Sequence, residues 1–112
     1  MSVRLKIYSI NQNQRMLKLY IRRVVGDSMK PVLCDGDIIV CKKQKQYRVN
    51  DIVLCRLSDR VLIKRISSIT EKRVYVLGDN ESSSTDSRQF GDVSKENVLA
   101  KYISHIVKRK IH

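Results

Sequence analysis

The sequence predicts a mainly β protein made of antiparallel strands with little helix. Three observations lead to this fold class. Apolar and polar residues alternate with a period of two, the alternating runs are rich in Val and Ile, and Asp, Ser, Asn or Gly bound them. The chain has 112 residues, no internal repeat and no composition shift typical of a linker. We therefore expect residues 1–112 to form a single domain.

Six runs of residues are predicted to be strands. Val3, Leu5 and Ile7 alternate with charged or polar residues near the start of the chain, and residues 17–22 repeat the pattern. The further runs lie at residues 37–42, 51–57, 60–66 and 73–77. Only residues 95–108 have a spacing compatible with a helix, and their apolar positions fit a terminal strand equally well.

The net charge of +12 is concentrated at the two ends of the chain. Residues 1–26 contain six basic residues and no acidic one, and residues 101–112 contain four and none. The 13 basic and 11 acidic residues of segment 27–100 leave only +2 there. The basic N-terminal strand region, residues 1–23, and the basic C-terminus predict a weak contact with an anionic membrane surface, or simply a solubilising surface. No specific nucleic-acid partner is expected.

Cysteine and histidine usage argues against a metal or another cofactor. Cys34, Cys41 and Cys55 are an odd number without a C-x-x-C pair, and the only histidines are His105 and His112. The cysteines stand among apolar residues and are predicted to be buried free thiols, which favours a reducing compartment. No apolar run has the length of a signal peptide or of a membrane span. We expect a cytoplasmic protein, at most peripheral at a membrane.

Glycine and proline are rare and mark two places in the chain. Gly26 and Pro31 flank the pair Ser28-Met29, whereas Gly78 and Gly91 bracket a polar segment. Glycine permits positive φ and close backbone approach, and proline fixes a bend, so these two segments are predicted to be sharply shaped loops. Such loops often carry catalytic residues on a rigid sheet, although plain hairpin turns have the same composition.

The segments around these loops resemble, in order and spacing, the bacterial type I signal peptidase family. The matching segments are Gly26-Asp27-Ser28-Met29-Lys30-Pro31, Asp35-Gly36-Asp37, Asn50-Asp51-Ile52-Val53, Ile63-Lys64-Arg65-Ile66, and Gly78-Asp79-Asn80 through Ser84-Thr85-Asp86-Ser87-Arg88 to Gly91. The resemblance covers roughly residues 20 to 103, and the motifs lie in a core of residues 24–103. The short form without an anchor is similar to the proteases that mature nickel superoxide dismutase.

The resemblance implies a role for each matching residue. Ser28 would be the nucleophile and Lys64 the general base, with Ser84 orienting the lysine through a hydrogen bond. The supporting residues would be Gly26 and Asp27 beside the oxyanion, Met29 and Pro31 at the substrate cleft, Gly78, Asp79 and Asn80 in a supporting turn, and Asp86 with Arg88 as a structural ion pair. Some relatives carry a serine hydroxyl at the position of Gly26, so here backbone N–H groups, that of Ser28 among them, would bind the oxyanion.

This chemistry sets a requirement for Lys64. An ordinary lysine has a pKa near 10.4, so only about one molecule in 2,500 is neutral at pH 7. The pKa must fall by roughly 3 for an effective base, and burial among apolar groups has that effect. Strand alternation places Lys64 on one face with Leu62 and Ile66, whereas Arg65 shares the other face with Ile63. Lys64 is therefore predicted to be the buried member of the Lys-Arg pair.

The resemblance implies a serine endopeptidase that removes an N-terminal signal or pro-segment from a protein precursor, after small residues. Two other functions are open. The self-cleaving domain of SOS-type repressors uses the same Ser/Lys pair on a related β fold and would need an internal Ala-Gly or Cys-Gly bond. The only alanine is Ala100 and neither dipeptide occurs. A non-catalytic basic binding module would leave Lys64 exposed to solvent.

Overall fold

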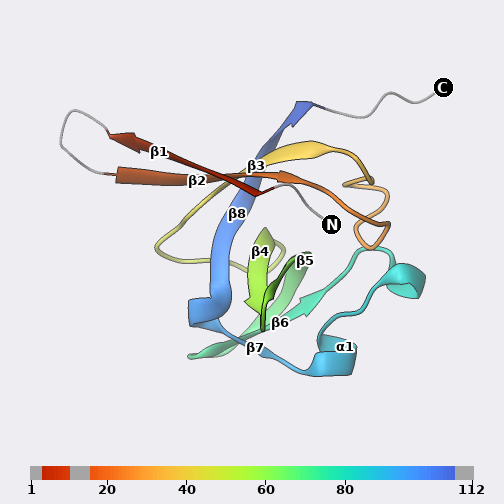
Figure 1. Cartoon of the computed structure of the whole chain (residues 1–112). Helices are drawn as coiled ribbons and strands as arrows, with labels where there is room; N and C mark the ends of the chain where they lie inside the picture. The colour runs from red at the N-terminus through yellow and green to blue at the C-terminus, as the bar shows by residue number, and fades with distance from the viewer. Residues whose placement is uncertain (1–3, 11–15, 108–112) are drawn as a thin grey trace.

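A computed structural model describes residues 4–10 and 16–107 of the chain, which form a single antiparallel sheet (Figure 1). Its strand order is β1-β2-β3-β8-β4-β5-β6-β7. The strands are β1 (Arg4–Ile10), β2 (Met16–Arg23), β3 (Ile38–Lys42), β4 (Ile52–Leu57), β5 (Arg60–Ile69), β6 (Arg73–Leu77), β7 (Val93–Ser94) and β8 (Val98–Val107). The predicted fold class, mainly β with antiparallel strands, is confirmed.

Helix is confined to single turns. These are η1 (Glu81–Ser83), α1 (Ser87–Phe90) and η2 (Lys95–Asn97). The C-terminal segment, whose spacing fitted either a helix or a strand, forms η2 and then the long strand β8. Within the described ranges, no helix has the length and apolar character needed to cross a membrane.

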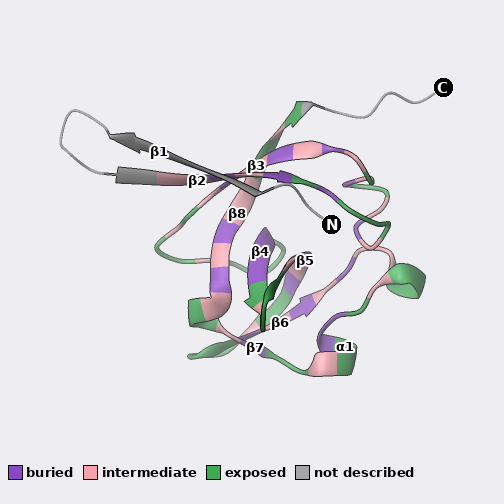
Figure 2. Ribbon diagram, in the orientation of Figure 1, coloured by how far each residue is buried: buried purple, intermediate pink, exposed green. Residues whose placement is uncertain are grey.

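Strand β4 shows why the sheet can enclose two cores. Its residues Ile52 to Cys55 are all buried, which means that both faces of the strand are covered. Ile52 and Leu54 belong to one apolar cluster, with Met29 among its members, whereas Val53 and Cys55 belong to a second cluster. Figure 2 shows buried residues concentrated where β3, β4 and β8 meet.

Strand β8 joins the two halves of the sheet. Its first residues pair with β4, for example Ala100 with Leu54, and its later residues pair with β3, for example Tyr102 with Cys41. Irregularities in the register accompany both pairings. Bulges of this kind bend and twist a strand, so one long strand can serve two differently oriented groups of strands (Figure 1).

Two long connections lie close together at one end of the sheet. We refer to residues 24–37, between β2 and β3, as the Ser28 loop, and to residues 78–92, between β6 and β7, as the Asp86 loop. The Ser28 loop is closed at its base, where the Val24 N–H donates to the Asp37 carbonyl at 2.8 Å. The Asn80 N–H of the Asp86 loop donates to the Ser28 carbonyl, also at 2.8 Å. Residues far apart in the sequence therefore share one backbone framework.

Candidate active site

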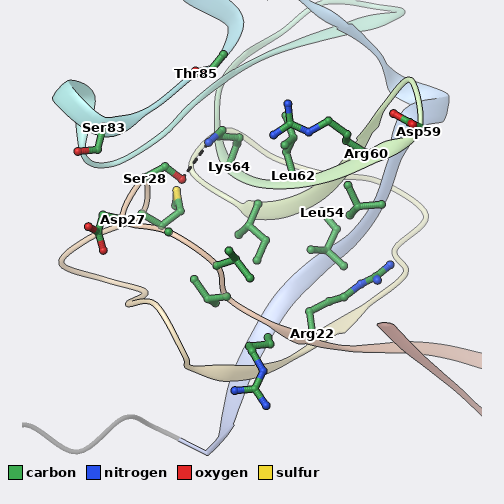
Figure 3. A pocket seen from close by; sticks show the side chains of 17 residues that line it. Arg22, Asp27, Ser28, Leu54, Asp59, Arg60, Leu62, Lys64, Ser83 and Thr85 are labelled. Atoms are coloured by element: carbon green, nitrogen blue, oxygen red, sulfur yellow. Dashed lines mark hydrogen bonds between the residues drawn. The ribbon is translucent and has the colours of Figure 1, made fainter. Parts of the chain in front are cut away.

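Ser28 and Lys64 meet where the Ser28 loop passes strand β5 (Figure 3). The Nζ atom of Lys64 lies 3.0 Å from the Oγ atom of Ser28, which is hydrogen-bond distance. The two side chains are 36 residues apart in the sequence, and the predicted contact between them is confirmed. A serine hydroxyl against an amine is the arrangement in which the amine, once neutral, can accept the hydroxyl proton.

Lys64 has the surroundings of a core residue. Only 4% of it is exposed, and it lies opposite Val53 of β4 in the antiparallel register. None of the ion pairs found in the described residues includes Lys64. Burial lowers the pKa of the amine, against a smaller opposing effect of the Asp86 carboxylate. The alternation that predicted a buried Lys64 is confirmed, and the direction of the pKa change is the one a general base requires.

The Ser28 loop is shaped by one glycine and one methionine. Gly26 has a φ of +86°, a conformation that side-chain-bearing residues rarely adopt, and its N–H donates to the Asp35 carboxylate at 2.7 Å. Met29 is 1% exposed and packs in the first apolar cluster. The turn between them presents Ser28. Its own N–H makes no hydrogen bond to any residue that the structure describes, so it is available for an oxyanion.

Asp86 organises the neighbouring loop. Its carboxylate is fully buried and accepts hydrogen bonds from the Gly78 N–H at 2.8 Å, from the Ser84 hydroxyl at 2.7 Å and from the Arg88 guanidinium at 2.7 Å and 2.9 Å. Burial alone would raise the pKa of this carboxyl, but the hydrogen bonds from Arg88, Gly78 and Ser84 hold the pKa well below its ordinary value. The expected ion pair between Asp86 and Arg88 is present, at 2.7 Å.

Two of the expected supporting contacts differ from the prediction. Ser84 was expected to hydrogen-bond Lys64, but its hydroxyl donates to Asp86 and forms no hydrogen bond with Lys64 in the structure. The buried carboxylate, two residues away in the same loop, holds the Ser84 side chain on its own side. Pro31 was expected at the substrate cleft, but it is exposed and lies outside the cleft lining. After Met29 the chain turns, with the Leu33 N–H donating to the Met29 carbonyl. This turn directs Pro31 away from Ser28 and Lys64, the pair that we call the dyad.

Gly78, Asp79 and Asn80 do more than shape a turn. Gly78 is buried where the two loops meet: a Cβ atom there would lie 2.8 Å from the Ser28 carbonyl oxygen and would collide with the Ser84 side chain. Asp79 accepts two 2.8 Å hydrogen bonds from the Arg65 guanidinium on β5. The Asn80 side-chain amide donates to the Asp27 carbonyl at 3.1 Å. Together they fix the Ser28 loop to the strand that carries Lys64.

A cleft of about 630 Å³ opens beside the dyad. It is lined by residues 22–29, by Leu54, by residues 59–64, and by Ser83 and Thr85. Arg60, Ser83 and Thr85 were not singled out from the sequence. For Arg60 a signal existed, since the alternation that places Lys64 with Leu62 extends to Arg60 (Figure 3). Ser83 ends the single turn η1 and Thr85 follows it in the loop, and so short a segment has no periodicity that would reveal which side chains face the cleft.

Other reactive groups lie away from this chemistry. Burial raises the pKa of the Cys41 thiol to about 12 and that of Cys55 to about 11, so both stay protonated and poorly nucleophilic. All three cysteines are free, as expected, although Cys34 is only half-buried. Within residues 4–10 and 16–107, no group of His, Cys, Asp and Glu is placed to bind a metal ion.

Part of the predicted basic surface lies outside the described residues. Arg15, Lys108, Arg109 and Lys110 belong to the ranges that the structure does not describe. Among the described basic residues near the ends of the chain, Arg22 and Arg23 line the cleft and Lys101 pairs with Asp51 at 3.4 Å. The two arginines therefore contribute to the candidate site as well as to the charge of the N-terminal region.

Comparison with known proteins agrees with this geometry. Residues 4–101 match the model of the Peptidase S24-like family. The chain is 39% identical over 69 residues to the LexA repressor of Shewanella loihica and 45% identical over 47 residues to that of Clavibacter sepedonicus. These matches cover 58% and 41% of the chain and 32% and 21% of the repressors, so the chain spans about a third of these relatives or less. The family match extends over most of the sequence, and the chain belongs to the Peptidase S24-like family.

Proposed function

We propose that the protein is a serine endopeptidase in which Ser28 is the nucleophile and Lys64 the general base. The observation that carries this proposal is the 3.0 Å contact between Lys64 Nζ and Ser28 Oγ, made by an amine that is 4% exposed and has a lowered pKa. A surface Lys-Ser contact would leave the amine charged and unable to accept a proton. The buried setting favours catalysis over a non-catalytic binding module.

The reaction follows from the positions of these groups. Neutral Lys64 takes the Ser28 hydroxyl proton while Oγ attacks the scissile carbonyl carbon. The developing oxyanion accepts a hydrogen bond from the Ser28 N–H. The intermediate collapses, the C–N bond breaks, and the Lys64 ammonium returns the proton to the departing amine. Lys64 then deprotonates a water molecule that hydrolyses the acyl ester, and Ser28 regains its proton.

The cleft favours an extended peptide as substrate. Residues Arg60 to Lys64 of β5 pair with β4 on one side, while the pairing of β5 with β6 begins only at Arg65. The other edge of that stretch is thus open along the cleft, and an extended peptide can pair with such an edge. The likeness to signal peptidases favours small residues before the cleaved bond. We propose a protein precursor with an N-terminal signal or pro-segment, and a superoxide dismutase pro-segment is the first to test.

Self-cleavage is the second candidate, because the relatives are named LexA repressors. The 112 residues contain neither an Ala-Gly nor a Cys-Gly bond, so we favour cleavage of a separate precursor. For the protease itself we propose a cytoplasmic location, with a weak peripheral contact of the basic ends at anionic membranes. Following the protein as its host expresses it separates the two candidates: a self-cleaving protein yields fragments of itself at a rate independent of its concentration, whereas the proposed protease stays intact.

The test of the proposal is a comparison of new N-termini in host cells with and without active protein. Precursors should lose their processed N-termini in the Ser28→Ala variant, while its thermal unfolding matches the original protein. Lys64→Arg should be equally inactive, by about 10³-fold or more, because a guanidinium stays protonated near neutral pH. Full processing by either variant, with contaminating proteases excluded, would show that the Ser/Lys mechanism is wrong.

A further inference from the structure

Basic residues outnumber acidic ones in the lining of the cleft beside the dyad. Arg22, Arg23, Arg60 and Lys64 line it, against two carboxylates, Asp27 and Asp59. Asp27 already pairs with Lys30 at 3.5 Å. Because Lys64 must be neutral to act as the base, the arginines set the sign of the field that a bound peptide meets. That field favours negative charge on the substrate.

Arg60 differs from the arginines that hold the fold together. Arg65, Arg73 and Arg88 each pair with a carboxylate, at 2.8 Å, 2.6 Å and 2.7 Å respectively. The Arg60 side chain is exposed and has no hydrogen bond or ion pair within the part of the chain that the structure describes, and neighbouring Asp59 forms none with it. Its guanidinium therefore keeps all its donors for a partner outside this part of the chain.

The position of Arg60 relates it to the cleaved bond. Arg60, Leu62 and Lys64 alternate along β5 and line the cleft, and Figure 3 shows their side chains on the same side of the strand. Arg60 and Lys64 are four residue steps apart along the strand, which corresponds to about 13 Å. An extended peptide lying along this edge advances by the same rise per residue. A side chain that meets Arg60 is then about four residues from the bond that Ser28 attacks.

We propose that Arg60 is a specificity-determining residue and that the substrates carry an acidic side chain about four residues from the cleaved bond. The proposal rests on the function proposed above and adds a substrate class to it. A guanidinium binds a carboxylate through two parallel hydrogen bonds, which a neutral amide of the same shape cannot match. Small residues at the bond would define where cleavage occurs, and the acidic residue would define which precursors bind.

Cleavage of matched peptides tests the proposal. Each peptide has small residues at the cleaved bond and carries Glu or Gln at one position, moved from three to five residues away on either side. The intact protein should prefer Glu to Gln in kcat/KM by roughly fivefold at one of these positions, the upper range for an ion pair partly open to solvent. Arg60→Gln should remove the preference and Arg60→Glu should reverse it.

Within one variant, the ratio of kcat/KM for the Glu peptide to kcat/KM for the Gln peptide cancels any effect of Arg60 on the dyad itself. Arg56→Gln is the matched control, because Arg56 is exposed on the adjacent strand β4 and lies outside the cleft lining. It should keep the full preference. Equal ratios for the intact protein and for Arg60→Gln, with both cleaving, would overturn the specificity proposal and leave the proposed protease function standing.

Binding provides a readout that does not depend on turnover. Ser28→Ala protein should bind a fluorescent Glu peptide about fivefold more tightly than its Gln counterpart, and Ser28→Ala with Arg60→Gln should bind both alike. If the intact protein cleaves no peptide but this binding preference is observed, the protease proposal is wrong and the recognition of acidic peptides by Arg60 stands. Equal binding of both peptides would overturn the proposal. If a single-stranded oligonucleotide binds instead and Arg60→Gln weakens that binding, the basic residues of the cleft recognise nucleic acid.

Discussion

Lys64 is a titratable amine in the place of a core side chain, and this position has a cost in stability. Its pKa is lowered by burial, which means that the folded protein holds the Lys64 proton less tightly than the unfolded chain does. Below the pKa in the folded state, the buried ammonium therefore opposes folding. The same destabilised ammonium is what makes a neutral base accessible, so catalysis and stability have opposite requirements at this residue.

We expect Lys64→Met to be inactive and more stable than the original protein at pH 7. Methionine fills a similar volume without a charge, and the gain should be about 1 kcal/mol in the free energy of unfolding. Between the pKa of Lys64 in the folded state and its ordinary value of 10.5, the unfolded chain binds more protons, so the original protein gains stability as the pH rises. The difference between the two proteins should therefore shrink toward pH 10.5.

Urea unfolding at pH 6, 8 and 10 measures this difference. Lys72→Met is the control, because Lys72 is exposed and should change the free energy of unfolding by less than about 0.5 kcal/mol at every pH. A Lys64→Met protein that is less stable at pH 7, or a difference that does not change with pH, would argue against a buried amine with a lowered pKa.

At the scale of elements, the Asp86 loop acts as a support for the Ser28 loop. Asp86 is the N-cap of α1: it accepts from the Arg88 N–H at 3.1 Å, and the Gln89 side chain accepts from the Asp86 N–H at 2.9 Å. The same carboxylate accepts hydrogen bonds from Gly78 and Ser84. Asn80, two residues after Gly78, in turn donates its N–H to the Ser28 carbonyl. A loop that contains only two single helical turns thereby becomes rigid enough to position a nucleophile.

Replacing Asp86 by asparagine should lower the free energy of unfolding, and it should act on Lys64 only indirectly, by removing a carboxylate that raises the pKa of the amine. Removing one partner of a buried ion pair costs about 3–5 kcal/mol, and a neutral amide at this position could not satisfy the same donors. Because the pKa of Asp86 is lowered in the folded state, its contribution is full above the ordinary value of 3.8 and disappears as the pH falls through the folded-state value. The stability difference in urea should be large at pH 7 and smaller at pH 3.

Asp92→Asn is the comparison for this prediction. Asp92 also pairs with an arginine, Arg73 at 2.6 Å, but both side chains are about half exposed. Loss of this ion pair should therefore lower the free energy of unfolding by no more than about 1 kcal/mol. An equal effect of the two substitutions would mean that Asp86 is no more than another surface ion pair.

Gly78→Ala tests the junction between the two loops directly. The added Cβ would lie 2.8 Å from the Ser28 carbonyl oxygen, a backbone atom that can move only with the loop. We expect a loss of about 1–3 kcal/mol in stability, typical of overpacking. We also expect kcat/KM to fall by about tenfold or more, because displacing a nucleophile by a fraction of an ångström disturbs its alignment.

Activity measured well below the unfolding temperature separates the two effects of Gly78→Ala. A variant that stays folded and keeps its full kcat/KM would show that the position of Ser28 does not depend on this contact. A folded variant with reduced kcat/KM is the expected result, since the displaced loop carries Ser28 and also lines the cleft.

At the scale of the whole molecule, the charge of +12 predicts weak and non-specific binding to polyanions. The purified protein should be retained by vesicles containing anionic lipid and by DNA of any sequence at low salt. Binding should decrease steeply as salt is added, because counterion release and screening dominate such contacts. Neutral vesicles are the control. If neither anionic surface retains the protein at low ionic strength, the charge serves solubility alone.

The sequence by itself determined the mainly β fold and the buried side of Lys64, because both depend on alternation along single strands. Through the resemblance, the order of the motifs also predicted that Ser28 lies beside Lys64 and that Asp86 pairs with Arg88, and the structure contains both contacts. Tertiary structure alone decided that Ser84 donates to Asp86, that Pro31 faces away from the cleft, and that Arg60 lines it without a partner among the described residues. These outcomes depend on how two irregular loops pack against the edge of β5, and no periodic pattern records the relative placement of segments so far apart in the chain.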